Sequence, residues 1–163
     1  MFEYLNIPVP EMKECIKISR EASDWIIPQV KSVYDGMKEI ILKLSKHFEL
    51  YTSSGTDYRT LKAYYKSQGI DHCFKKLYGS DLVGIFKSHP DYFNRIFKDS
   101  GVDPNKAIVI DDKEKVLDLI DGFGAKCVVS NLSGAAINTG NYPVFNNLSE
   151  LLNIISEITG VMA

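Results

Sequence analysis

The segment Ala107-Ile108-Val109-Ile110-Asp111-Asp112 indicates the fold class of this chain. Four apolar, mostly β-branched residues lead into two adjacent carboxylates, a pattern typical of a buried parallel strand. The carboxylates then lie at the C-terminal end of the strand, where open α/β sheets bind their ligands. Because neighbouring carboxylates repel each other, a hard divalent cation such as Mg²⁺ suits them. Alternatively, one aspartate caps the following helix and the other is solvated.

The composition is that of one ordinary globular domain: 163 residues, of which 45% are hydrophobic. The 19 basic and 21 acidic residues include no basic run, so we expect neither nucleic acid nor a membrane surface as a partner. Cys15, Cys73 and Cys127 lie far apart without metal-ligand spacing, which predicts reduced thiols in a cytoplasmic protein. No membrane-spanning run or signal-peptide pattern is present, and the oligomeric state is left open.

Helical and strand patterns alternate along the chain. After an irregular arm at 1–10, helices are expected at 11–27, 34–47, 58–67, 91–98, 114–120 and 148–158. Strands are expected at 48–53, 74–80, 107–112, 126–130 and 143–145, with a connection at 133–141. This alternation predicts an α/β fold, a three-layer, Rossmann-like, mainly parallel sheet with helices on both faces.

Polar residues follow two of these strands and precede one helix. In Thr52-Ser53-Ser54-Gly55-Thr56, hydroxyls, backbone amides and a helix N-terminus suit an anion, although an ordinary N-cap cluster has the same composition. Lys87 precedes the helix at 91–98, and a single lysine is otherwise a solvated surface residue. Because the C-terminal ends of parallel strands share one edge, we expect Thr52 or Ser53, Lys87 and Asp111 with Asp112 in one crevice.

This order of a Ser/Thr, a lysine and an acidic pair resembles the haloacid dehalogenase (HAD) superfamily. The resemblance runs from about Val33 to Val129 and includes Tyr34-Asp35-Gly36, Tyr78-Gly79-Ser80-Asp81, Pro90 and Gly124-Ala125-Lys126. It implies a HAD-like α/β core at 33–163, preceded at 1–32 by an N-terminal arm and helix that form a short helical cap remnant.

The resemblance also implies roles for the polar residues. In that family an aspartate nucleophile forms a covalent aspartyl intermediate, which water hydrolyses. Thr52, Ser53 and Ser54 would contact a phosphoryl oxygen, and Lys87 would balance its charge beside the catalytic Asp111. Asp111 and Asp112 would hold Mg²⁺, which offsets charge in the transition state. A small phosphorylated molecule or phosphate is the implied partner.

The chain departs from the family at its first motif, Asp-x-Asp-x-Thr. No Asp-x-Asp occurs upstream of Thr52, where Asp24 and Asp35 are the aspartates, each in a helical or turn context. The central strand that carries this motif is missing too, so the strands at 48–53 and 107–112 should either flank a gap or pair directly. Smaller departures are Ser88, where a proline is usual, and Val116, where a further acid is frequent.

Two interpretations follow. The first is a HAD-type hydrolase, a Mg²⁺-dependent phosphatase for a small phosphorylated substrate, whose nucleophile motif is absent through truncation or a mis-set start. The alternative is a non-catalytic HAD-like module that binds phosphate or regulates. Both predict a chain that is inactive as it stands. Receiver domains also combine paired aspartates with a lysine, but there the pair follows the first strand and the lysine comes late.

Overall fold

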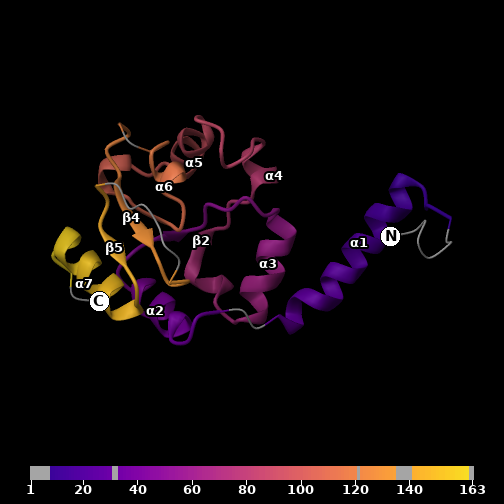
Figure 1. Ribbon diagram of the computed structural model, residues 1–163, viewed down its shortest axis with the longest axis horizontal. Helices are drawn as coiled ribbons and strands as arrows, with labels where there is room; N and C mark the ends of the chain where they lie inside the picture. The colour runs from indigo at the N-terminus through magenta and orange to yellow at the C-terminus, as the bar shows by residue number, and fades with distance from the viewer. Residues whose placement is uncertain (1–7, 31–32, 121, 135–140, 162–163) are drawn as a thin grey trace.

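The computed structural model describes residues 8–30, 33–120, 122–134 and 141–161 (Figure 1). Its α-helices are α1 (Met12–Ile26), α2 (Met37–Leu44), α3 (Tyr58–Ser67), α4 (Ser80–Val83), α5 (Tyr92–Ser100), α6 (Glu114–Leu117) and α7 (Leu148–Thr159). Short 3₁₀ turns are η1 (Ile27–Gln29), η2 (Asp71–Cys73) and η3 (Pro104–Lys106). The strands are β1 (Leu50–Tyr51), β2 (Phe74–Lys76), β3 (Ile108–Asp111), β4 (Lys126–Ser130) and β5 (Val144–Phe145).

The strands form two sheets, one of order β1-β2 and one of order β3-β4-β5. Every pairing is parallel, as the alternation of strands and helices predicted. Within the described residues, no backbone hydrogen bond joins β1 to β3. The strands expected at 48–53 and 107–112 therefore do not pair directly, and each is an edge strand.

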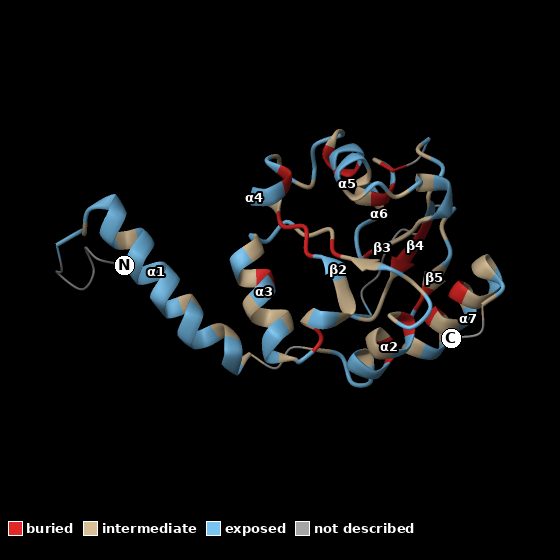
Figure 2. Cartoon of the chain, turned by 180° about the vertical axis from the view of Figure 1, so that it is seen from behind, coloured by how far each residue is buried: buried red, intermediate tan, exposed pale blue. Residues whose placement is uncertain are grey.

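Helices cover both faces of the strands. On one face, Tyr92 and Phe93 of α5 and Leu117 of α6 pack in one apolar cluster with Tyr51 of β1 and Val109 of β3. Figure 2 shows buried residues in both α5 and β4. These contacts form the first of two apolar interfaces.

On the other face, Ile40 of α2 and Leu151 of α7 pack in a second cluster with Leu50 of β1 and Ile108 of β3. Because both clusters contain residues of both sheets, the two sheets form one interrupted layer between two helical layers. The predicted three-layer α/β fold is confirmed.

Local signals explain the element ends that the sequence predicted well. Asp57 caps α3 by accepting a hydrogen bond from the Thr60 amide, and Asn147 caps α7 through the Glu150 amide. α5 ends at Gly101, whose φ of 71° suits a residue without a Cβ atom.

Several elements are shorter than predicted. The ladder between β1 and β2 shifts register between Leu50 and Tyr51, and this shift limits the length of both strands. The strand predicted at 74–80 was wrong at its end, because Ser80 starts the unpredicted helix α4. α2 begins only after Gly36, whose φ is 81°, although a helix was predicted from residue 34. α6 ends at Leu117, although a helix was predicted up to residue 120.

The N-terminal helix α1 projects from the rest of the chain (Figure 1). It contains no buried residue, and an ion pair joins its Asp24 to Arg59 of α3. The proposed boundary between 32 and 33 adjoins residues 31–32, which lie outside the described residues, as do 1–7 of the predicted arm and 135–140 of the predicted connection. Of the helices that the structure describes, none is long and apolar enough to cross a membrane.

Candidate functional site

Asp111 ends β3 and is buried, with 7% of its surface exposed. Strand alternation places it on the same face as Val109, toward α5 and α6. Its Oδ1 accepts a hydrogen bond of 3.0 Å from the Lys113 amide, and its Oδ2 accepts one from Lys87 Nζ. The next residue, Asp112, is exposed. The two carboxylates are therefore in different environments, one buried and paired and the other in solvent.

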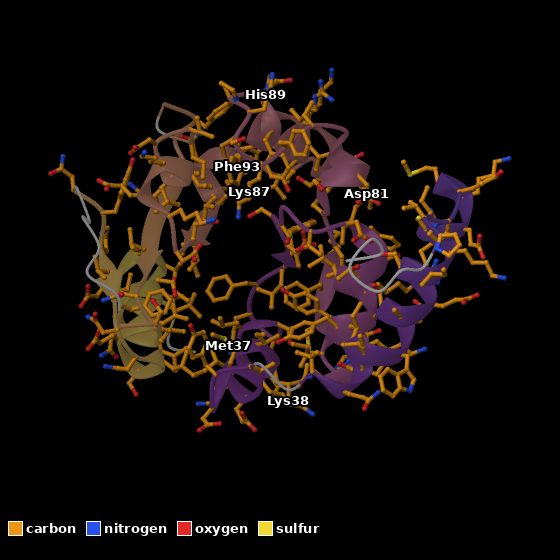
Figure 3. The ribbon with its side chains drawn as sticks, turned by 45° about the vertical axis from the view of Figure 1, so that its right-hand side comes forward. Met37, Lys38, Asp81, Lys87, His89 and Phe93 are labelled. Atoms are coloured by element: carbon orange, nitrogen blue, oxygen red, sulfur yellow. The ribbon has the colours of Figure 1, made fainter. Side chains whose placement is uncertain are left out.

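Lys87 lies in the segment between α4 and α5, and its ammonium group joins the two sheets. Besides Asp111, it donates a 2.6 Å hydrogen bond to the backbone carbonyl of Ser53, which follows β1. Its side chain is 19% exposed, so the ion pair is partly shielded from water. In Figure 3, Lys87 and Phe93 lie on the α5 side of the sheets, and Met37 lies on the opposite, α2 side. Ser53, Lys87 and Asp111 thus meet at the C-terminal ends of β1 and β3.

The three predicted hydroxyls after β1 are used differently. Thr52 is buried, and its Oγ1 accepts a hydrogen bond of 2.7 Å from the Tyr78 amide and donates one of 3.2 Å to the Tyr78 carbonyl. Ser54 Oγ accepts a hydrogen bond from the Thr56 amide. Within the described residues, the Ser53 hydroxyl makes no hydrogen bond, so it is the one of the three that is open to a ligand.

The loop that carries these hydroxyls is held by the segment after β2. Ser80 Oγ donates a hydrogen bond of 2.9 Å to the Gly55 carbonyl, and the Ser80 amide donates one of 3.1 Å to the Thr56 carbonyl. Gly79 packs directly on this loop, because a Cβ atom there would lie 2.5 Å from the Tyr58 nitrogen. The loop is therefore fixed by several backbone contacts.

Tyr92 of α5 also supports this loop, and the sequence did not reveal this role. Its hydroxyl donates a hydrogen bond of 2.9 Å to the Ser54 carbonyl. Burial, with a smaller contribution from the charge of Asp111, raises the pKa of Tyr92 to about 12. The phenol consequently stays protonated at neutral pH. The sequence places Tyr92 in the predicted helix at 91–98 but gives no sign of the partner of its hydroxyl.

The carboxylates fit Mg²⁺ only in part. Asp111 and Asp112 offer the hard oxygen ligands that Mg²⁺ prefers. Among the residues that the structure describes, no group of three or more His, Cys, Asp or Glu side chains gathers as a metal site. Mg²⁺ is commonly held by one or two carboxylates together with waters and phosphate oxygens. A metal at these carboxylates would therefore need further ligands, such as waters and phosphate oxygens.

Two surface hollows lie away from this cluster. One, of about 560 Å³, lies between α1 and α3 and is lined in part by Arg20, Arg59 and Asp81. The other, of about 480 Å³, is lined in part by Lys126 and Tyr142. Neither of these two hollows is lined by Lys87 or Asp111.

A family model described as haloacid dehalogenase-like hydrolase matches residues 9–118. Among curated proteins, none matches this chain.

Solved structures share the fold at low sequence identity. One is the structure of the HAD-hydrolase YfnB from Bacillus subtilis bound to magnesium. Its TM-score is 0.69 and its sequence identity is 17%, and the match covers 94% of this chain and 87% of that one. CbbY from Rhodobacter sphaeroides, in complex with phosphate, has a TM-score of 0.69 and 18% identity over 88% of this chain and 68% of that one. A dehalogenase has a TM-score of 0.65 and 23% identity over 76% of this chain, which spans 56% of that protein.

Proposed function

Because this chain belongs to the haloacid dehalogenase-like hydrolase family, we propose that it carries the phosphate-binding part of a Mg²⁺-dependent phosphatase site for a small phosphorylated molecule. The position of Lys87 carries this proposal. Its Nζ uses two of its three donor hydrogens, on Ser53 and Asp111, and the third remains for a phosphoryl oxygen. The open hydroxyl of Ser53 supplies a second donor beside it.

In this proposal the predicted residues have unequal roles. Lys87 balances the charge of a bound phosphoryl group, and Ser53 donates a hydrogen bond to it. Thr52 keeps the loop attached to Tyr78 and does not contact the ligand, because its hydroxyl is buried and already paired. Ser54 contributes its hydroxyl only if it releases the Thr56 amide.

Asp111 and Asp112 would hold Mg²⁺ together with an oxygen of the bound phosphoryl group. The metal would offset the negative charge of that group. This part of the proposal is supported by the donor chemistry of the two residues and by the magnesium in the YfnB structure. The phosphate in the CbbY structure supports the choice of ligand.

The sequence contains no Asp-x-Asp segment upstream of Thr52, and we therefore expect binding without turnover from this chain alone. Covalent catalysis requires a nucleophile at the bound phosphorus. The alternative proposal, a non-catalytic module that binds phosphate or regulates, rests on the same observation. We also propose that residues 1–32 form a cap remnant and that residues 33–163 form the core. The proposed location is the cytoplasm, which agrees with the free thiols of Cys15, Cys73 and Cys127.

Thermal unfolding in matched ionic strength tests the proposal. We expect 10 mM phosphate with Mg²⁺ to raise the unfolding temperature relative to chloride, because a ligand that binds the native state stabilises it. Lys87→Ala should abolish this increment, whereas Lys98→Ala, which removes an exposed lysine of α5, should retain it. An increment that survives Lys87→Ala would overturn the assigned phosphate site.

Turnover of p-nitrophenyl phosphate distinguishes the two interpretations. No release of nitrophenol above background is expected from the purified chain with Mg²⁺. Turnover that is lost in Asp111→Ala would show that another residue supplies the nucleophile. Turnover that survives this substitution would show that a different chemistry operates.

A further inference from the structure

The hollow between α1 and α3 opens at the same edge of the sheets as the cluster around Lys87. Asp57 and Asp81 both line this hollow. Asp57 ends the loop that follows β1, and Asp81 lies beyond the C-terminal end of β2, which runs parallel to β1. Figure 3 shows Asp81 and Lys87 on one side of the molecule and Met37 and Lys38 on the other. A ligand at Lys87 can therefore extend toward the hollow.

The loop after β1 connects the two places. Ser53 precedes Asp57 by four residues, and four residues of chain span at most about 14 Å. Ser80 fixes this loop through the carbonyls of Gly55 and Thr56. The hollow has a volume of about 560 Å³, which is in the range of small-molecule sites. One small molecule can therefore contact Ser53 and enter the hollow.

Two acidic side chains of the hollow are paired with the N-terminus of α3. Asp57 Oδ1 accepts a hydrogen bond of 3.1 Å from the Thr60 amide, and Asp81 Oδ1 accepts one of 2.8 Å from the Tyr58 amide. The positive end of the helix dipole offsets negative charge at this position. These two carboxylates are therefore compensated by the backbone of α3.

The two arginines of the hollow differ in their partners. Arg59 donates hydrogen bonds to both carboxylate oxygens of Asp24, so these two charges compensate each other. The Arg20 side chain makes no hydrogen bond or ion pair with any residue that the structure describes. Its guanidinium is therefore the positive group that the hollow offers to a ligand. A planar guanidinium binds a carboxylate through two parallel hydrogen bonds.

The lining around Arg20 also includes apolar surface and hydroxyl groups. Ile16 is exposed and Ile27 is half-buried, so both can contact the carbon chain of a ligand. Such contacts would remove apolar surface from water. Ser19 and Ser23 lie about one helical turn apart on α1 and add hydroxyl groups to the same lining. This combination suits an aliphatic molecule that has an anionic group at its end.

We propose that Arg20 binds a carboxylate of the ligand whose phosphoryl group lies at Lys87 and Ser53. The ligand class is then a phosphorylated aliphatic carboxylic acid. This inference rests on the proposed function, because it requires the phosphoryl group at Lys87. Arg20 determines specificity in this proposal and does not contact the reacting phosphorus.

Calorimetric titration of the full chain with phosphonohexanoate in the presence of Mg²⁺ tests the role of Arg20. This probe has a phosphonate at one end of its carbon chain and a carboxylate at the other, and the matched probe has a neutral carboxamide in place of the carboxylate. We expect the carboxylate to bind about tenfold more tightly than the carboxamide, as for a charge-assisted hydrogen bond. Arg20→Gln should remove this preference.

Lys13→Gln is the matched control, because it removes an exposed positive charge of α1 that does not line the hollow. It should retain the preference for the carboxylate. Equal affinity of the two probes for wild type, a preference that survives Arg20→Gln, or one that Lys13→Gln also removes would overturn this inference.

Inorganic phosphate separates this inference from the proposed function, since phosphate has no carboxylate. Phosphate should stabilise wild type and Arg20→Gln equally against thermal unfolding. If it stabilises both while the two probes bind wild type equally, the proposed function stands and the role of Arg20 is refuted. If it does not stabilise wild type, the proposed function is wrong and this inference fails with it.

Discussion

Lys87 Nζ donates a hydrogen bond to Asp111 Oδ2 and so joins two residues that are 24 positions apart. The side chains are 19% and 5% exposed, respectively. Removing one partner of such a shielded pair is costly, because it leaves the other charge buried without compensation. We expect Lys87→Met to lower the free energy of unfolding by about 3 kcal/mol in urea titrations.

The double variant with Asp111→Asn provides the control for this prediction. Without the carboxylate charge, the loss of the ammonium group should cost less, so the two substitutions should be non-additive by about 1–2 kcal/mol. The side-chain oxygen of the introduced amide would still accept a hydrogen bond from the Lys113 amide. Additive losses would show that the ion pair does not determine the stability of this region.

The hydroxyl of Thr52 is predicted to stabilise the end of β1. Thr52→Val keeps the shape of the side chain but leaves the buried Tyr78 amide without its 2.7 Å acceptor. An unpaired buried amide costs about 1–3 kcal/mol, so we expect a loss of about 2 kcal/mol in urea unfolding. Thr52→Ser retains the hydroxyl and should lose about 1 kcal/mol or less. Similar losses in both variants would contradict a role for the hydroxyl.

Asp57 makes a pH-dependent contribution through the N-terminus of α3. The Thr60 amide hydrogen bond lowers the pKa of Asp57 below its ordinary value of 3.8, although partial burial opposes this shift. Because the folded pKa is lowered, the contribution is fully present above the ordinary pKa and is lost as the pH falls through the lowered value.

Asp57→Ala should therefore cost about 1 kcal/mol at pH 7, a typical value for an N-cap, and progressively less below pH 3.8. Asp57→Asn provides the control, since asparagine also caps helices but does not titrate there. Urea unfolding of the three proteins from about pH 2.5 to 7 measures the difference. A constant gap between wild type and Asp57→Ala over this range would refute the assignment.

Local sequence signals determined some elements fully. α3 and β4 have the predicted limits: α3 has its own N-cap and C-terminal glycine region, and β4 is a continuous apolar run. β1 and β2 were predicted too long because their length depends on a register shift between strands. No local pattern of side chains encodes such a shift.

The site shows the same division. Strand ends in a parallel sheet share one edge, and this rule predicted that Ser53, Lys87 and Asp111 approach one another. It did not predict which hydroxyl after β1 is open, because that depends on contacts with the backbone of Tyr78 and with the Thr56 amide. Only the tertiary structure shows the contact with Tyr78, because that residue lies 26 positions from Thr52 in the sequence.

Gly79 is predicted to be indispensable for the shape of the loop after β1. A Cβ atom at this position would lie 2.5 Å from the Tyr58 nitrogen, 2.6 Å from the Thr56 oxygen and 2.8 Å from the Asp57 carbonyl carbon. All three are backbone atoms, so no side-chain rotation relieves the overlap. Gly79→Ala should therefore destabilise the chain by about 3 kcal/mol, the upper end for an overpacked site.

Gly55→Ala is the matched control in the same loop, because a Cβ atom there would meet nothing within 4 Å. Its unfolding free energy should stay within about 0.5 kcal/mol of wild type, as for an ordinary surface substitution. The displaced loop in Gly79→Ala should also move Ser53 away from Lys87 and reduce the stabilisation by phosphate. If Gly79→Ala unfolds at the same urea concentration as Gly55→Ala, the close backbone packing that fixes this loop is not a constraint on the fold.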